Sequence, residues 1–329
     1  MKLVLVGLPG CGRTTLLKAL AGDPDLDPAK PLTVKVPDPR LDRLAELAEV
    51  RRKVATSMVF VDVPSPAFEP KHMTRMQDAS AIVLVLDNYA RGNLERDFLS
   101  AEGELCLSDL STVENRSNRL IKEGRKGCRE LELLDRLRDH LEKGLPLRTM
   151  DLTPSELSML RGYSFLSQKP ILVVINRADR PVADEGALIE VADRHQASTT
   201  AVNAAFELEL SELPEEEHQA FLGSMGYQGS SLSRLIRQAY VSLDLVTFFT
   251  MNPEEVRAWP LPRNATALEA AGKVHSDMAR GFVRAEVVGF ERFADCPDMP
   301  ELRSRGELRV EGKDYVIRDG DIIQVRFSV

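Results

Sequence analysis

The sequence is short of cysteine and of long apolar runs, and each shortage excludes a class of protein. Its four cysteines, Cys11, Cys106, Cys128 and Cys296, lie far apart, without the spacing of a disulfide framework or a zinc site. No apolar stretch approaches the roughly 20 residues of a membrane-spanning helix, and the apolar start of the chain is too short for a signal peptide. These absences predict a cytoplasmic protein that does not enter a membrane.

Basic residues are outnumbered, which excludes proteins that coat nucleic acid through bulk charge. The chain has 43 Lys and Arg against 51 Asp and Glu, for a net charge of −8. Nonspecific binding to nucleic acid depends on many Lys and Arg side chains that neutralise phosphates, so no binding to DNA is expected. With 329 residues, 43% of them hydrophobic, the chain is long enough for two or three globular domains.

Short apolar runs alternate with helical patterns through much of the chain. The predicted buried strands are residues 2–6, 57–61, 81–86 and 171–175, and the predicted helices include 13–21, 213–223 and 231–243. Strands that alternate with helices are typical of a parallel, doubly wound sheet. The fold class predicted for this part is therefore α/β.

Two regions depart from this pattern. Residues 93–143 contain no proline, and leucines recur every three or four positions among dense charges, which predicts an inserted helical hairpin with its turn at 123–127. After residue 245, short β-branched and aromatic runs are separated by turn signals, which predicts a small β-rich domain. The predicted domains are 1–92 with 165–245, the insertion 93–164, and 246–329.

A glycine-rich segment follows the first predicted strand and opens the first predicted helix. It reads GLPGCGRT from Gly7 to Thr14 and matches the phosphate-loop pattern G-x-x-x-x-G-K-[ST], except that Arg13 replaces the lysine. Such a loop turns backbone N–H groups toward an anion at a helix N-terminus. The predicted nucleotide contacts are Gly7, Pro9, Gly10, Cys11, Gly12, Arg13, Thr14 and Thr15. A glycine-rich turn without a ligand is the alternative.

Two further motifs follow later predicted strands. Asp62 comes directly after residues 57–61, where an aspartate can hold Mg²⁺ together with Thr14, or can simply cap a turn. Asn176, Arg177 and Asp179 match N-K-x-D with arginine for lysine. In that motif the carboxylate can accept from guanine, the asparagine braces the phosphate loop and the Arg177 stem can pack over the base. An ordinary loop is the alternative for this tetrapeptide.

Basic side chains crowd the predicted hairpin turn. They are Arg116, Arg119, Lys122, Arg125, Lys126 and Arg129. They could contact RNA phosphates, or they could form a solvated face interleaved with glutamates. The five histidines are scattered and no catalytic constellation is present, so the catalytic residues cannot be named.

Taken in order, these features resemble the YchF or Obg-like ATPase family of P-loop NTPases. The resemblance runs nearly end to end and is densest at residues 36–42 (VPDPRLD), 107–114 (LSDLSTVE), 256–259 (VRAW) and 280–286 (RGFVRAE). It implies a Ras-like nucleotide domain, a helical coiled-coil insertion and a C-terminal TGS domain of ubiquitin-like β-grasp form. It also implies ATP or GTP with Mg²⁺ as ligands, a ribosome- or RNA-related partner, and a last base-contact loop at Asn203 and Ala204.

Departures from the family pattern fall where hydrolysis would be organised. Arg13 replaces the lysine, Ser65 stands where the D-x-x-G run has its glycine, and residues 87–93 lack the histidine thought to act in the family. Asp179 replaces the glutamate of the family's N-x-x-E motif, which favours GTP over ATP by a narrow margin. The sequence therefore predicts a purine-nucleotide switch with weak or absent hydrolysis. The alternative is a pseudo-NTPase scaffold whose TGS domain is the working part.

Overall fold

The chain divides into two compact units, each described separately below. The structure is a computed structural model that describes residues 1–90, 92–179, 182–224 and 229–328. The N-terminal unit comprises Met1–Val34 and Met58–Ser242, and the C-terminal unit comprises Lys35–Ser57 and Leu243–Val329. The sequence places residues 35–57 in the nucleotide domain, whereas in the structure they belong to the C-terminal unit. The reason is that β3 (Arg52–Val54) pairs with β9 (Glu255–Pro262), far away along the chain.

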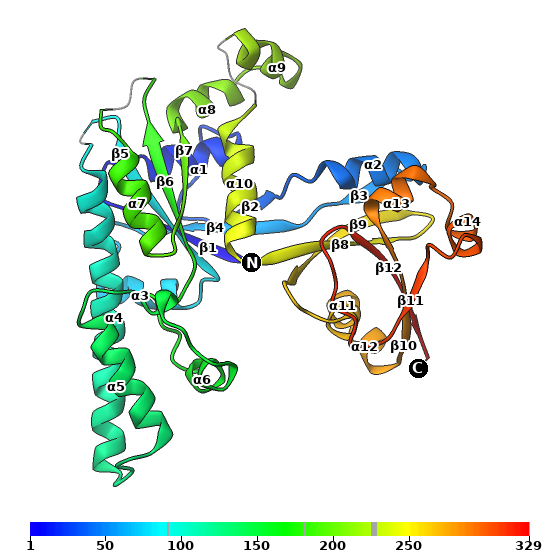
Figure 1. Cartoon of the computed structure of the whole chain (residues 1–329). Coiled ribbons are helices and arrows are strands. Elements are labelled where there is room, and N and C mark those ends of the chain that lie inside the picture. Colours follow the sequence, from blue (N-terminus) through cyan, green and yellow to red (C-terminus); the bar gives the residue numbers. More distant parts are fainter. Residues whose placement is uncertain (91, 180–181, 225–228, 329) are drawn as a thin grey trace. The chain divides into compact units, whose positions relative to one another are not determined.

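A six-stranded sheet forms the centre of the N-terminal unit (Figure 1). Its order is β2-β4-β1-β5-β6-β7, and β1 pairs in parallel with both β4 and β5. The strands are β1 (Lys2–Val6), β2 (Leu32–Lys35), β4 (Ser57–Asp62), β5 (Ala81–Asn88), β6 (Ile171–Arg177) and β7 (Ser198–Val202). Strand β1 therefore has a neighbouring strand on each side. Open α/β sheets bind their ligands beside such a strand, at the carboxyl ends of the strands.

Helices cover both faces of this sheet. Residues of α3 (Pro70–Gln77), α4 (Leu94–Lys122) and α7 (Gly186–Arg194) share one apolar core with alternate residues of β1, β5 and β6. Figure 1 shows α1 (Arg13–Ala21) and α10 (Ser231–Ser242) on the other face. The α/β fold with a parallel sheet is thereby confirmed, and β1 and α1 have the predicted bounds. Strand β7 and helix α8 (Ala204–Ser211) were not predicted, and predicted helix 213–223 corresponds to α9 (Glu215–Ser224).

The predicted hairpin is present as α4 followed by α5 (Arg129–Leu141), with the connecting turn where the sequence places it. Leucines of both helices pack with residues of the segment that follows, which contains a short 3₁₀ turn (Leu147–Thr149) and α6 (Pro154–Leu160). The buried Asp109 carboxylate accepts the Leu166 and Ser167 N–H groups at 2.8 and 2.7 Å and the Ser167 hydroxyl at 2.7 Å. The hairpin is thus fastened to the chain that returns to β6. Its coiled-coil form and its limits as a domain stay predictions.

The C-terminal unit is built on a second six-stranded sheet of order β11-β10-β12-β8-β9-β3. Its further strands are β8 (Leu245–Met251), β10 (Phe282–Gly289), β11 (Arg309–Glu311) and β12 (Asp321–Phe327). Its helices are α2 (Pro39–Leu47), α11 (Ala267–Val274), α12 (Ser276–Arg280), α13 (Phe290–Asp295) and α14 (Met299–Ser304). The predicted β-rich character is observed, and the assignment as a TGS domain stays a prediction.

Buried charges of the C-terminal unit are paired. The Glu286 carboxylate accepts from Arg303 at 2.7 Å and from Arg326 at 3.1 Å. One Asp321 oxygen accepts from the Tyr315 hydroxyl at 2.9 Å and from a backbone N–H at 2.9 Å. Burial alone raises the pKa of Glu286, but the two arginines outweigh it and hold that pKa below its ordinary value.

Candidate nucleotide site

The phosphate loop connects β1 to α1 at the carboxyl edge of the sheet, and two of its glycines admit no side chain. Gly7 has a φ of 156°, and a Cβ there would lie 2.5 Å from the Val85 carbonyl oxygen. Gly12 has a φ of 89°, in the left-handed region, and a Cβ there would overlap the Asn176 side-chain nitrogen. The loop backbone therefore passes closer to its neighbours than any other residue type would allow.

The start of α1 offers backbone donors to an anion. Gly12 is the N-cap residue and supplies no side-chain cap, and the first turn contains no acidic residue. The first N–H groups of a helix have no partner within the helix, and its N-terminus carries a partial positive charge. Thr14 and Thr15 lie in that first turn, as the sequence predicts. The geometry is suited to phosphate.

Cys11 lies inside this loop and is 2% exposed. Burial raises the pKa of its thiol, and the neighbouring Arg13 opposes this only in part. A buried and protonated thiol is a poor nucleophile. Cys11 is therefore a packing residue of the loop.

Arg13 is folded onto the segment that follows β4. Its Nη2 donates to the Ser65 hydroxyl at 2.6 Å, and its Nη1 donates to the Val63 carbonyl oxygen. Its Nε lies 3.6 Å from Asp62 Oδ1, and the Arg13 side chain is only 10% exposed. Arg13 and Ser65, the two residues that depart from the motif patterns, are therefore in direct contact.

Asp62 and Thr14 offer oxygen ligands of the kind that Mg²⁺ prefers. Asp62 Oδ1 is buried and has no hydrogen-bond partner among the described residues, so it could accept from the water shell of a cation. Burial raises the pKa of this carboxyl, with Arg13 opposing the rise. The donor atoms of Asp62 and Thr14 thus suit the ion, while the Arg13 guanidinium, 3.6 Å from the same carboxylate, opposes it by its charge. No group of three or more His, Cys, Asp or Glu within the described ranges could form a metal centre by itself.

Tyr89 reaches the phosphate loop from the turn after β5. Its hydroxyl donates to the Gly10 carbonyl oxygen, and the buried Asp87 carboxylate accepts the Tyr89 and Ala90 N–H groups, both at 2.9 Å. Sequence reasoning missed this residue. The signal was available, because the turn after a strand that neighbours β1 must end at the same edge of the sheet.

Asn176 joins the phosphate loop to the loop after β7. It is 5% exposed, its Nδ2 donates to the Cys11 carbonyl oxygen at 3.0 Å, and its Oδ1 accepts the Ala204 N–H at 3.1 Å. Asn176 thus braces the loop as its motif implies. The Ala204 N–H, which the resemblance assigns to the base, is bonded to Asn176 in this structure.

Asp179 and Asn203 lie together at the expected base side of the site. Asn203 Nδ2 donates to Asp179 Oδ1 at 3.1 Å, and Asn203 Oδ1 caps α8 by accepting the Phe206 N–H at 3.1 Å. Arg177 forms a two-pronged pair with Glu185, at 2.7 and 2.6 Å. Glu185 was not recognised from the sequence. It holds the Arg177 guanidinium beside the base loop.

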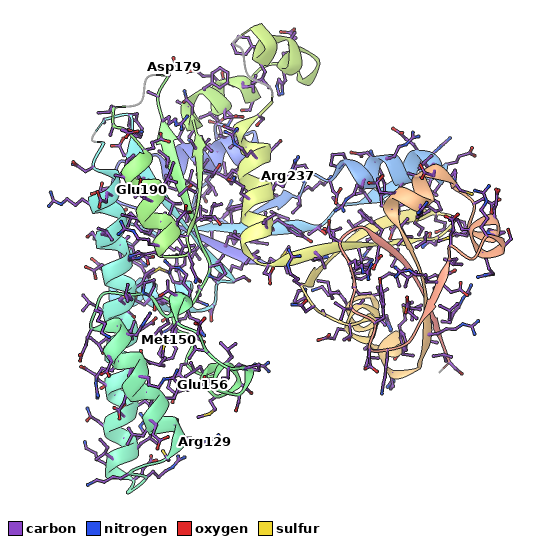
Figure 2. All side chains as sticks on the ribbon, viewed as in Figure 1. Arg129, Met150, Glu156, Asp179, Glu190 and Arg237 are labelled. Carbon is purple, nitrogen blue, oxygen red and sulfur yellow. The ribbon has the colours of Figure 1, made fainter. Side chains whose placement is uncertain are left out.

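A cleft of about 1220 Å³ opens beside these base-side residues. Its lining includes Arg177, Asp179, Asn203, Phe206 and Arg237, and Figure 2 marks Asp179 and Arg237. A second cavity of only about 10 Å³ lies between Leu8 and Asp87, and none of Arg13, Thr14 and Asp62 lines it. The cleft on the base side is therefore the larger of the two spaces that border predicted site residues.

The hairpin turn lies at the opposite end of the N-terminal unit from Asp179, as the label on Arg129 shows in Figure 2. Glu130 pairs with two of the basic residues, Arg116 at 2.7 Å and Arg125 at 3.5 Å. Four further basic side chains of the turn are exposed: Arg119, Lys122, Lys126 and Arg129. The structure thus leaves a small basic surface at this end.

Curated relatives match this chain over almost its full length. The ribosome-binding ATPases YchF of Escherichia coli O157:H7 and of Bacillus subtilis are each 33% identical to this chain, and each alignment covers 99% of the chain and 98% of the relative. The chain belongs to the YchF family. A family model named YchF-GTPase_C, described as a protein of unknown function (DUF933), matches residues 245–328.

Two solved structures share the fold. The Schizosaccharomyces pombe YchF GTPase superposes with a TM-score of 0.87 at 22% identity, covering 99% of this chain and 97% of that one. A GTP binding protein from Pyrococcus horikoshii OT3 gives 0.63 at 16% identity over the full length of both chains. In this YchF protein, no helix within the described ranges is long and apolar enough to cross a membrane.

Proposed function

We propose that this protein binds a purine nucleotide between the phosphate loop and the Asp179 side of the site, and uses the bound state as a switch. The observation that carries the proposal is the loop itself. Gly7 and Gly12 hold the backbone where no Cβ fits, at the N-terminus of a helix that starts with unpaired N–H groups. Glycine makes this backbone path accessible, and the path leaves the N–H groups at the start of the helix open to an anion.

The residues of the site divide the work of binding. Backbone N–H groups at the start of α1 would hold the phosphates, and the Asn176 side chain would keep the loop in register with the base side. Thr14 and Asp62 would hold Mg²⁺, which when bound neutralises phosphate charge. Arg13, Val63 and Ser65 already connect the loop to the segment after β4. A phosphate that contacts Arg13 would therefore also act on that segment, which is the basis of the proposed order–disorder switch.

For the base, we favour GTP over ATP by a narrow margin. The Asp179 carboxylate can accept from guanine N1 and N2 but has no such donor pair on adenine, and it lines the cleft beside Asn203. The relatives carry both kinds of name, ATPase and GTPase.

In a calorimetric titration we expect GTP to bind more tightly than ATP, and we expect Asp179→Glu to shift the preference toward ATP. Equal affinities for both nucleotides in the protein and in the variant would contradict the role of Asp179.

We propose a ribosome- or RNA-related partner, which the names of the ribosome-binding relatives support. The hairpin turn is the candidate contact in the N-terminal unit, because its exposed basic side chains could meet RNA phosphates. The C-terminal domain is the second candidate. Ribosome co-sedimentation should weaken when Arg119, Lys122, Lys126 and Arg129 are changed together to alanine. Exchange of the paired surface arginine Arg138 for alanine serves as the control.

Hydrolysis is proposed to be weak or absent. Ser65 stands where the family pattern has a glycine whose N–H would sense the γ-phosphate, and the added hydroxyl is bonded to Arg13. One observation favours the alternative of a pseudo-NTPase scaffold: the Arg13 side chain is only 10% exposed and is bonded to Val63 and Ser65 instead of being free for a phosphate. Thermal unfolding separates the two proposals. Nucleotide at 100 times its Kd should stabilise a binding protein by about 2.7 kcal/mol, whereas a scaffold shows no shift with either GTP or ATP.

A further inference from the structure

Arg13 links the phosphate loop to Asp62 and to the segment after β4. It belongs to the loop by sequence and to the segment after β4 by its contacts, with the Ser65 hydroxyl at 2.6 Å and the Asp62 carboxylate at 3.6 Å. The guanidinium therefore connects the two elements that a divalent cation connects in phosphate-loop proteins.

The charge of Arg13 is suited to the role that a divalent cation has at this position. A guanidinium carries a permanent positive charge and presents several N–H donors in a plane, which matches phosphate oxygens in a two-pronged arrangement. Here Nη1 and Nη2 bind Val63 and Ser65, while Nε faces a buried carboxylate oxygen that has no hydrogen bond among the described residues. A dication at that carboxylate would sit beside a charge of its own sign, which weakens its binding.

Ser65 explains how the arginine keeps this position. Its hydroxyl is the side-chain acceptor for Nη2, and a glycine at position 65 would offer none. A lysine at position 13 would present a single ammonium group and could not make the same set of contacts. The exchanges at positions 13 and 65 are therefore two halves of one arrangement.

Resting on the proposed function, we infer that Arg13 supplies, between Asp62 and the nucleotide phosphates, the positive charge that Mg²⁺ otherwise supplies. Nucleotide binding by this protein is then largely independent of Mg²⁺. Ser65 is a positioning residue that acts through Arg13. Restoring lysine at position 13 restores the need for the metal ion.

The test is the ratio of nucleotide Kd in excess EDTA to Kd in excess Mg²⁺, measured with non-hydrolysable GTP and ATP analogues on the full chain. We expect a ratio below roughly threefold for the protein and above roughly tenfold for Arg13→Lys. Ser65→Ala, which removes the Arg13 acceptor, should give an intermediate ratio. Arg138→Lys makes the same exchange in a surface ion pair on α5 and should leave the ratio unchanged.

The outcomes separate this inference from the function on which it rests. A ratio above tenfold for the unchanged protein would overturn the inference alone, whether or not the variants fold. Equal ratios for the protein, Arg13→Lys and Ser65→Ala would overturn it as well. Absence of binding in both buffers would overturn the proposed function, and this inference with it.

Discussion

The two units differ in how completely their buried polar groups are hydrogen-bonded. Within the described residues, every buried side-chain oxygen or nitrogen without a hydrogen bond belongs to the N-terminal unit: on Asp62, His72, Glu102, Ser117, Thr200 and Gln238. In the C-terminal unit, buried acids such as Glu286 and Asp321 are bonded to several donors. A buried polar atom without a partner costs about 1–3 kcal/mol.

The difference indicates where the chain gives up stability for a task. Satisfied networks hold a unit in one conformation, whereas Asp62 Oδ1, at a strand end, has no hydrogen bond among the described residues and faces only the Arg13 guanidinium at 3.6 Å. Changes at the carboxyl edge of the N-terminal unit should therefore act on binding. Changes in the networks of the C-terminal unit should act on folding alone.

The largest effect is expected at Gly12. In Gly12→Ala the new methyl group would overlap Asn176, so we expect nucleotide binding to weaken by more than about a hundredfold. Gly124→Ala is the matched control, because Gly124 also has a positive φ, of 76°, but nothing lies within 4 Å of its added Cβ. That variant should lose about 1 kcal/mol of stability and keep its nucleotide affinity. Similar affinities for the two variants would mean that the close approach at Gly12 is unimportant.

Asp321→Ala probes the opposite side of the comparison. It leaves the Tyr315 hydroxyl and the Arg318 N–H without their acceptor, so the unfolding free energy of the C-terminal unit should fall by roughly 3 kcal/mol. Nucleotide affinity should not change. Urea unfolding and calorimetry on one preparation measure both. The exposed Asp314→Ala should stay within about 0.5 kcal/mol of the unchanged protein. A drop in nucleotide affinity for Asp321→Ala would contradict the expectation that changes in the C-terminal unit affect folding alone.

Asn176→Ala should affect folding and binding together. It removes the bonds to the Cys11 carbonyl and the Ala204 N–H, so we expect a loss of roughly 2 kcal/mol in stability and roughly tenfold in nucleotide affinity. Asn115→Ala, at an exposed position on α4, is the control for the loss of an asparagine. If binding is unaffected while stability falls, then Asn176 is only a structural brace.

The smallest effects are pH dependences of opposite sign. The pKa of Glu286 is lowered because Arg326 and Arg303 outweigh burial. The ionised Glu286 therefore adds to the free energy of unfolding above about pH 4.3, and this stabilisation is lost as the pH falls through the lowered pKa. The stability gap between the protein and Glu286→Gln should shrink in acid. Burial raises the pKa of Asp109 instead. The free energy of unfolding of the protein, relative to that of Asp109→Asn, should therefore fall as the pH rises from about 4. Urea titrations across this range measure both gaps, and slopes of the same sign would contradict the assignment.

Local signals predicted the elements that the sequence specifies locally. The glycine loop marks the end of β1 and the start of α1, and the leucine spacing marks the hairpin. Strand β7 was missed because Ser198, Thr199 and Thr200 give it a polar beginning, although Thr200 is buried in the sheet. Residues 35–57 were misplaced for a different reason. Their strand β3 is held by β9, and no local pattern reports a partner so distant in sequence.

The site shows the same limit. Motif spacing found Gly12, Asn176 and Asp179, because a strand end followed by a loop fixes where such residues lie. It did not find the contact between Arg13 and Ser65 or the reach of Tyr89 to Gly10, since each depends on the path of two loops in space. Two exchanges that look like independent losses in the sequence form one interaction in the fold.

Helix α4 has the proportions of a spacer. Its 29 residues form one uninterrupted helix, about 43 Å long at 1.5 Å per residue. It begins just beyond the turn that brings Tyr89 to the phosphate loop and ends at the basic hairpin turn. Its first turns pack against the sheet, and Asp109 ties its middle to the chain that returns to β6. The helix is therefore a spacer that holds the basic turn at a fixed distance of several tens of ångströms from the phosphate loop.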